Sequence, residues 1–441
     1  MPDLDDALKV SSLKKLADNA RETGALNEVS DELSLNDIAD KGVLGQLQQY
    51  RDSFGNPTGR PQKTRRNCYL IIRHDKRLSK KIWLDSFKNV LMFGKEDYTD
   101  TDDTLLSLWI DAVYGASYAP GTIMEMTRKV GEENKKNELT DWLNGITWDK
   151  KPRSEHWLIN GAGVEDTELN QTISRCWLIQ AVARALKPGT KGDVCLILVG
   201  PQGAKKSTLL EAIAGKEYFA DTPLDIGSRN AYIQLQRAWI YEVAELDSIR
   251  RSHNSSTKAF LSATEDTFVP PYGRHAVSIK RHVCFCGSTN EDMFLRDKTG
   301  SRRFWPVKVG KIDLAWAREN REQLWAEAVH LYKSGAQWWL GQNNETELAE
   351  ESTQYEESDP WLSIISDFLI GRGGSALETS DIMREALKLE SHHMSRVNSS
   401  RLHEVMSKLG WYRERKTYQG ARGYYWVKST EIINLSKMSD L

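Results

Sequence analysis

The chain has 441 residues, of which 39% are hydrophobic, so two or three domains with buried cores are expected. The 60 Lys and Arg residues nearly balance the 62 Asp and Glu residues, which excludes a strongly basic protein but leaves local basic surfaces open. The five cysteines lack partners at metal-ligand spacing and indicate reduced cytosolic thiols. No apolar run approaches the roughly 20 residues that span a bilayer, so a cytoplasmic protein without a membrane partner is predicted.

The first part of the chain is polar and then helical. Residues 1–60 are predicted to form a polar arm or linker, because they end in a stretch rich in glycine and proline. Residues 61–190 are predicted to form a mostly helical domain, since apolar residues recur at the spacing of one helix face between residues 105 and 113. A helix over residues 169–186 is expected to end at the sequence Lys-Pro-Gly.

The sequence pattern changes again in the rest of the chain, from residue 191 onward. Residues 191–344 alternate short apolar runs, such as CLILVG and HVCFCGST, with helical stretches, which predicts a parallel sheet covered by helices and the α/β class. Residues 345–360 hold seven acidic and no basic residues, so they are expected to be a linker. Residues 361–428 carry eleven Lys or Arg against seven Asp or Glu. Two helical patterns, over residues 379–389 and 396–409, are followed by a basic hairpin, a layout typical of a winged helix. Residues 429–441 are predicted to form a C-terminal tail.

One run, DVCLILVGPQGAKKSTLLEAIAG, predicts a strand, a phosphate-binding loop and the start of a helix. A helix that begins there directs its free N–H groups at the loop, with Lys206 as a cation and Ser207 as a hydroxyl ligand for Mg²⁺. The pattern G-x-x-x-x-G-K-[ST] counted from Gly200 requires glycine at position 205, where this chain has Lys205. Glycine there tolerates positive φ, so lysine predicts a strained loop and slow hydrolysis, or a second cation beside the phosphates. An ordinary turn with surface lysines is the alternative. The predicted loop residues are Gly200, Pro201, Gln202, Gly203, Ala204, Lys205, Lys206, Ser207 and Thr208.

Further catalytic candidates follow the loop. Glu242 and Glu245 end an apolar strand about 35 residues later, and phosphoryl transfer to water needs one carboxylate near Mg²⁺ and another that orients the water. A solvated acidic helix start is the alternative. Asn290 ends another apolar strand and is expected to sense the γ-phosphate. The pair Arg302 and Arg303 predicts an arginine finger that acts on a neighbouring subunit, or else a local partner for acidic side chains.

Two hairpins are predicted to contact DNA. The first, within residues 262–280, has the tip Pro-Pro-Tyr-Gly-Arg-His, which suits single-stranded nucleic acid because the ring can stack on bases and the arginine can contact phosphates. A plain surface hairpin is the alternative. The second is the basic hairpin near the C-terminus. The predicted DNA-binding residues are Tyr272, Arg274, His275, Arg413, Arg415, Lys416 and Arg422.

The order of these motifs resembles the virulence-associated protein E family of phage and prophage replication proteins. The resemblance covers residues 65–345 and rests on TDWLNGITWDKKPR, the loop run above, WIYEVAELD, KAFLSATEDTFVPPYGR and STNEDMFLRDKTGSRRFWPV. The family is similar to superfamily three helicases, which are ring-forming AAA+ ATPases. By this resemblance Lys206 and Ser207 match the phosphate-loop lysine and Mg²⁺ ligand, and Glu242 and Glu245 match the acidic Walker B positions.

The resemblance implies an AAA+-like P-loop ATPase core with a helical N-terminal domain and a C-terminal winged helix. It further implies ATP and Mg²⁺ as cofactors, single-stranded or forked DNA as a partner, a homo-oligomeric ring such as a hexamer, and an ATP-dependent DNA helicase. Many family members carry an upstream primase-polymerase module, for which the N-terminal arm has no room, so a separate primase or polymerase is expected. Two alternatives remain: a DNA-binding replication or packaging accessory with a degenerate nucleotide site, and a DNA-sensing defence ATPase.

Overall fold

The structure, a computed structural model, describes residues 39–244, 254–269, 275–290, 294, 302–355, 359–372, 376–390, 393, 395–418 and 421–428. The chain divides into two compact units. Among the described residues, the first unit extends to Thr353, and the second consists of Phe294 and the residues from Gln354 onward. Each unit has hydrophobic cores of its own.

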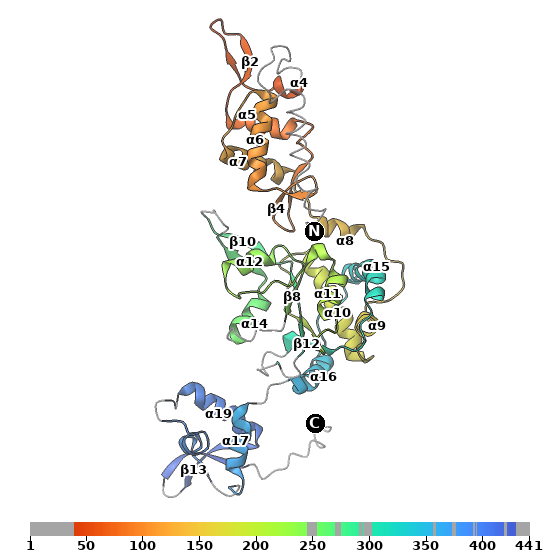
Figure 1. The fold of residues 1–441 in the computed structure, drawn as a ribbon. Coiled ribbons are helices and arrows are strands. Elements are labelled where there is room, and N and C mark those ends of the chain that lie inside the picture. Colours follow the sequence, from red (N-terminus) through yellow and green to blue (C-terminus); the bar gives the residue numbers. More distant parts are fainter. Residues whose placement is uncertain are drawn as a thin grey trace. The chain divides into compact units, whose positions relative to one another are not determined.

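The first unit begins with a small body of helices and short strands (Figure 1). Its elements are α4 (Lys41–Leu44), β1 (Gln49–Arg51), β2 (Pro57–Pro61), α5 (Arg65–His74), β3 (Ile82–Asp85), β4 (Val90–Phe93), β5 (Glu96–Asp97), α6 (Asp100–Tyr114) and α7 (Pro120–Glu133). The sequence sets the ends of α6, since Thr99 and Asp102 form a capping box and Gly115 ends the helix in the left-handed conformation. The helices of this body enclose a core of their own, distinct from the core around the sheet that follows.

The predicted polar arm is shorter than residues 1–60, because its described part, from residue 39, is folded. Val43, Leu44 and Leu47 are buried in the same core as α5 and α6. Val43 and Leu44 belong to α4 and Leu47 follows it, and the burial of these three apolar side chains explains why the segment packs. The predicted arm therefore needs correction from residue 39 onward, whereas residues 1–38 lie outside the described part.

Three further helices, predicted to belong with the N-terminal domain, share a core with the sheet instead. They are α8 (Glu138–Gly145), α9 (Trp157–Ala162) and α10 (Glu168–Leu186). Helix α10 matches the prediction over residues 169–186 and is buried on nearly all sides, which is the pattern of a helix enclosed by other elements. The domain bounds themselves stay a prediction.

A five-stranded sheet forms the centre of this core. Its strands are β6 (Cys195–Val199), β7 (Phe219–Ala220), β8 (Ile240–Ala244), β11 (Cys284–Thr289) and β12 (Phe304–Lys308). The strand order is β12-β6-β11-β8-β7 and every neighbouring pair is parallel. The α/β class with a parallel sheet is therefore confirmed. The edge strand β12 includes Pro306, which a central strand would not tolerate.

Helices and a hairpin surround the sheet. They are α11 (Lys206–Ala214), η1 (Lys216–Tyr218), α12 (Arg229–Leu235), α14 (Asn254–Ser262), the antiparallel pair β9 (Glu265–Phe268) and β10 (Val277–Lys280), and α15 (Leu314–Lys333). Helices α10, α11 and α15 pack together beside the sheet (Figure 1). The five cysteines are free and buried, as expected of reduced thiols.

Buried tryptophans fix α11 against its neighbours. The rings of Trp239 and Trp325 lie 4.2 Å apart between the sheet and α15. Trp325 Nε1 donates to the carbonyl of Ile213 at 2.8 Å, and Trp239 Nε1 donates to the carbonyl of Ala181 at 2.8 Å. Each indole thus satisfies its one donor while burying a large ring, which joins α15 to α11 and the sheet to α10.

The acidic segment predicted as a linker over residues 345–360 is largely helical. It contains most of α16 (Gln342–Ser352) and η3 (Thr353–Tyr355). Leu348 and Tyr355 are buried, so these apolar side chains hold an otherwise acidic helix in place. The composition shift marks the change of unit near residue 353, but residues 345–352 are a packed helix.

The second unit combines helices with a long hairpin. Its elements are α17 (Pro360–Leu369), α18 (Thr379–Asp381), the π-helix η4 (Ile382–Ala386), α19 (Arg396–Lys408), β13 (Trp411–Tyr418) and β14 (Ala421–Lys428). The predicted helix over residues 379–389 is instead a short α-helical turn followed by η4. The predicted helix over residues 396–409 and the hairpin are present, and the hairpin packs through Trp411 and Trp426 on the helices.

Candidate functional site

The loop between β6 and α11 is anchored at both ends. The Gly200 N–H donates to the carbonyl of Thr289 at 3.1 Å, which links the loop to the end of β11. A methyl group at Gly200 would lie 2.6 Å from Cγ2 of Val309, so only glycine fits this close approach. Because β6 is wholly buried, the loop emerges from the middle of the sheet at a fixed point.

Lys205, the residue that departs from the phosphate-loop pattern, takes the left-handed backbone conformation at φ 66° and ψ 30°. It is the N-terminal cap residue of α11. A non-glycine residue pays roughly 1–2 kcal/mol for this conformation because its Cβ approaches a carbonyl oxygen. The chain therefore adopts with lysine the backbone shape that glycine would take more easily.

Lys206 lies in the first turn of α11 and directs its ammonium back at the loop. Its Nζ donates to the carbonyls of Gly200 at 2.8 Å and Pro201 at 3.0 Å. The residue is only 9% exposed. Burial lowers the pKa of Lys206, and the nearby Glu242 carboxylate opposes that shift. The ammonium is thus held between the loop carbonyls and the carboxylate.

Glu242 joins three elements of the site. Its Oε1 accepts hydrogen bonds from Ser207 Oγ at 2.8 Å and from Ser288 Oγ at 2.5 Å. The residue is 1% exposed, and its Oε2 is buried with no hydrogen-bond partner among the described residues. Burial raises the pKa of Glu242, while the Ser288 and Ser207 hydroxyls oppose the shift.

Lys206, Ser207 and Ser288 line a cavity of about 260 Å³ at the carboxyl edge of the sheet, and Glu242 lies buried behind the two serines. Open parallel sheets bind ligands at this edge. Asn290, which follows β11, is exposed and lines the same cavity. The lining residues are Gln202, Gly203, Ala204, Lys205, Lys206, Ser207, Thr208, Ser288, Thr289 and Asn290. The structure thus gathers the predicted loop, Asn290 and, through Ser207, Glu242.

Ser288 and Thr289 were not predicted as site residues. A signal was present, because Ser288 alternates with Cys284 and Cys286 in a strand whose residues are all buried. A hydroxyl in such a strand needs a polar partner. Three predicted residues, Glu245, Tyr272 and Arg274, lie outside the described residues, and His275 is exposed just before β10.

Arg302 and Arg303 lie at the opposite edge of the sheet. They precede β12, and Phe304 pairs with Cys195 at the start of β6, so the two arginines are at the amino edge. Arg303 Nε lies 2.9 Å from Ser262 Oγ and 3.4 Å from Asp193 Oδ2. The structure does not bring either arginine to the cavity that holds Lys206.

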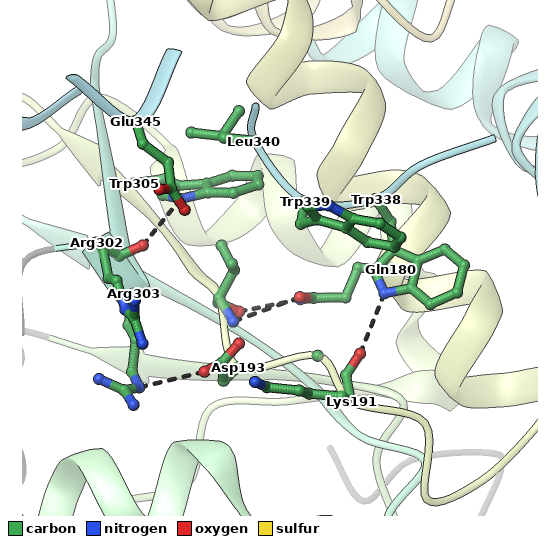
Figure 2. A pocket seen from close by; sticks show the side chains of 12 residues that line it. Gln180, Lys191, Asp193, Arg302, Arg303, Trp305, Trp338, Trp339, Leu340 and Glu345 are labelled. Atoms are coloured by element: carbon green, nitrogen blue, oxygen red, sulfur yellow. Dashed lines mark hydrogen bonds and ion pairs between the residues drawn. The ribbon is translucent and has the colours of Figure 1, made fainter. Parts of the chain in front are cut away.

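The two arginines line a separate cavity of about 390 Å³ (Figure 2). Trp338 and Trp339 form part of its wall, and Trp338 Nε1 donates to the carbonyl of Lys191 at 3.1 Å. Trp305 Nε1 donates to the carbonyl of Arg302 at 3.2 Å, which fixes the turn before β12.

In the second unit, the predicted DNA-binding residues of the hairpin fall on two faces. The register pairs Arg415 with Tyr424 and Thr417 with Arg422, so Arg413, Arg415 and Arg422 share a face. The guanidinium carbons of Arg413 and Arg415 lie 5.3 Å and 5.9 Å from the Tyr424 ring centroid. Lys416 is on the other face, 6.0 Å from the ring of Tyr418. The structure thus separates Lys416 from the three arginines.

Neither a metal-binding cluster nor a membrane-spanning helix is found among the described residues. No group of three or more His, Cys, Asp or Glu side chains in that part of the chain is arranged to hold a metal ion. Across the same residues, no helix combines the length and apolarity needed to cross a bilayer.

Comparison with known proteins gives one family match. The family described as Virulence-associated protein E-like domain matches residues 143–357. No curated protein matches the chain. Solved structures that match include "The apo structure of NrS-1 C terminal region (305-718)", with 14% identity, a TM-score of 0.38, and coverage of 65% of this chain and 78% of that chain. Another is "The A form apo structure of NrS-1 C terminal region-CTR(305-718)", with 13% identity, a TM-score of 0.39, and coverage of 65% and 77%.

Proposed function

We propose, for a chain whose residues 143–357 form a virulence-associated protein E-like domain, that the protein is an ATPase of phage-type DNA replication that works as a helicase. Its substrate would be ATP with Mg²⁺, bound at the carboxyl edge of the sheet. Its polymer partner would be single-stranded or forked DNA. The core would then be an AAA+-like P-loop domain and the second unit a winged helix.

The observation that carries this proposal is the hydrogen bond between Ser207 and Glu242 at the foot of the loop. A hydroxyl and a carboxylate are the oxygen ligands that Mg²⁺ takes beside a nucleotide. The buried Oε2 of Glu242 without a partner among the described residues fits such an ion, since an isolated buried carboxylate oxygen is costly unless something binds it. When bound, Mg²⁺ would neutralise charge on the phosphates.

The remaining groups fit binding of a triphosphate. Lys206, now bonded to loop carbonyls, would exchange them for phosphate oxygens, which are stronger acceptors for an ammonium group. The first N–H groups of α11 face the same loop and favour an anion. Asn290, which lines the cavity from β11, is suited to contact the terminal phosphate or the attacking water.

A degenerate nucleotide site is the second candidate, and Lys205 is the observation that favours it. The left-handed backbone at this position weakens that reading, because the loop keeps its shape without glycine. The lysine side chain then adds a cation beside the phosphates instead of deforming the loop. We therefore favour an active ATPase over a binding-only accessory.

Hydrolysis between subunits would account for the arginines at the amino edge. Neither Arg302 nor Arg303 lines the cavity of its own chain's loop, so a finger from this pair has to act on another copy. Arg303 is engaged with Asp193 and Ser262, whereas Arg302 is exposed. Arg302 is thus the better candidate, and the active form would be a ring.

The test is DNA-stimulated ATP turnover with unwinding of a forked duplex. Lys206→Ala should lower turnover at least about a hundredfold, because a charge-stabilising donor is removed. The matched control is Lys216→Ala, which removes an exposed lysine beyond the other end of α11 and should leave the rate unchanged. Native turnover no higher than that of Lys206→Ala would refute the ATPase and favour the binding-only accessory.

A further inference from the structure

The hairpin of β1 and β2 holds two aromatic rings in solvent. Phe54, in its turn, is 89% exposed, and Tyr50 is 49% exposed. The hairpin projects from the helices α4 and α5 of its own body (Figure 1). A turn of this kind needs Gly, Asn or Asp for its geometry and gains nothing from a phenylalanine. An exposed ring at this position therefore indicates a contact outside the chain.

The turn holds Phe54 rigidly outward. Asp52 Oδ1 accepts hydrogen bonds from the N–H groups of Phe54 at 2.9 Å and Asn56 at 2.8 Å. The Gly55 N–H donates to the carbonyl of Asp52 at 3.0 Å, and Gly55 supplies the positive φ of 85°. Because the turn is ordered before any partner binds, little further entropy is lost when the ring makes its contact.

The base of the hairpin is fixed to α5 by one buried side chain. Asn67 Nδ2 donates to the carbonyls of Gln48 at 2.7 Å and Gln62 at 2.9 Å, and Asn67 Oδ1 accepts from the Gln48 N–H at 3.0 Å. The hairpin and the first turn of α5 therefore form one rigid piece, on which charges from both elements keep a fixed spacing.

That piece is basic within a chain that is slightly acidic overall. Residues 51–66 contain five exposed Lys or Arg side chains: Arg51, Arg60, Lys63, Arg65 and Arg66. The single acid in this stretch is Asp52, which is occupied by the turn. Arg51 donates to the carbonyl of Gly55, and Arg65 lies 3.4 Å from Glu125. Across the described residues, the other three cations have no ion pair.

We infer that this surface binds single-stranded nucleic acid. The hairpin face, defined as Tyr50, Phe54, Arg60, Lys63 and Arg66, combines rings on which bases stack with cations that contact phosphates. Charge complementarity favours a phosphate polymer over an acidic protein, because the cations are spread along an extended segment. A membrane surface is disfavoured, since two rings on a hairpin lack the broad apolar face by which a helix lies on a bilayer.

This contact lies beyond the proposed function, whose DNA contacts are on the β9–β10 hairpin and the second unit. It needs neither ATP nor the loop at Lys206. A chain that proves inactive as an ATPase can still bind a strand through the hairpin face, so the two proposals fail separately.

The experiment measures fluorescence anisotropy of a labelled oligothymidylate with the full chain, without nucleotide, across a salt series. Phe54→Ala should weaken binding about tenfold at constant salt dependence, and Phe54→Trp should restore it. The triple variant Arg60→Ala, Lys63→Ala, Arg66→Ala should make the slope of log K against log salt shallower by about 2, since each lost phosphate contact on a single strand removes about 0.7.

The matched control is the double variant Met124→Ala, Arg128→Ala on α7 of the same body, which removes one exposed apolar and one exposed basic side chain elsewhere. It should bind as the native chain does. Thermal unfolding of each variant verifies folding. Unchanged affinity in Phe54→Ala together with an unchanged slope in the triple variant would overturn the inference. Loss of binding to phosphatidylserine vesicles in Phe54→Ala with unchanged oligonucleotide affinity would also overturn it, in favour of a membrane.

Discussion

The Ser207 hydroxyl donates a 2.8 Å hydrogen bond to Glu242 Oε1, which joins the first turn of α11 to strand β8 across the parallel sheet. Ser288 donates to the same oxygen from β11. Two hydroxyls on one oxygen orient the carboxylate, whose buried Oε2 has no hydrogen-bond partner among the described residues. The candidate Mg²⁺ position thus depends on strands β8 and β11 and on the first turn of α11.

Removing each serine should have different consequences. Ser207→Ala removes a proposed metal ligand and should abolish Mg²⁺-dependent ATP turnover. Ser288→Ala removes only a group that orients Glu242, so it should weaken Mg²⁺ activation by about tenfold while leaving the maximal rate close to native. Turnover against Mg²⁺ concentration measures both effects. Equal loss in the two variants would contradict this division of roles.

The buried carboxylate should make the protein less stable as it ionises. Burial raises the folded-state pKa of Glu242 above its usual 4.5, so the associated stability is present below that pH and is lost as pH rises through the folded value. Glu242→Gln removes this penalty and should be more stable than the native chain at neutral pH, with the difference vanishing in acid. Urea unfolding at several pH values measures it. The prediction is contradicted if Glu242→Gln is less stable than the native chain at neutral pH and the two proteins are equally stable in acid.

His282 should contribute acid sensitivity. It is buried beside Phe87, with ring centroids 4.6 Å apart. Burial, aided by the Arg184 charge, lowers the pKa of His282 from 6.5 to about 4. Its stabilising contribution is therefore complete above pH 6.5 and falls by up to about 3 kcal/mol as pH drops through 4.

In the variant His282→Gln, the free energy of unfolding should change less with pH between pH 6.5 and 4 than it does in the native chain. The exposed His74→Gln is the control and should retain the native slope. Equal slopes in native and His282→Gln proteins would show that this histidine is not the group that titrates.

If an arginine finger acts on a neighbouring subunit, mixing two inactive variants should restore part of the ATP turnover. Arg302→Ala and Lys206→Ala should each be inactive alone, but random mixing in one ring pairs an intact loop with an intact arginine at about a quarter of the head-to-tail interfaces. Turnover of the mixture should therefore recover to about that fraction of native. A mixture as inactive as its components would mean that Arg302 does not act on a neighbouring subunit.

Much of the site could be predicted because strand ends and loop residues are local in sequence. The strand before Gly200, the helix from Lys206 and the position of Asn290 directly after β11 follow from short patterns. Glu242 was predicted at a strand end and lies instead in the middle of β8. Parallel pairing then brings them together, since the carboxyl ends of parallel strands meet at one edge. The sequence does not reveal which side chain of β11 contacts Glu242 on β8, and Ser288 was not predicted for that reason.

Other features depend on packing or on strand direction. Arg302 and Arg303 precede a parallel strand, so they had to lie at the amino edge, away from the loop. The folded segment from residue 39 was missed because α4 has only four residues, too short for a periodic signal. The left-handed backbone of Lys205 could not be predicted from its residue type, because lysine rarely adopts this conformation.

We propose that lysine at position 205 leaves an active ATPase loop, and the most direct test compares the ATP turnover of the native chain with that of Lys205→Gly. The backbone already has the conformation that glycine favours, so relief of strain should change the rate by less than about tenfold, equivalent to about 1.4 kcal/mol in the barrier. Robust native turnover with a Lys205→Gly rate inside that range is the predicted result. Turnover that appears only in Lys205→Gly would contradict the claim and make the native site degenerate.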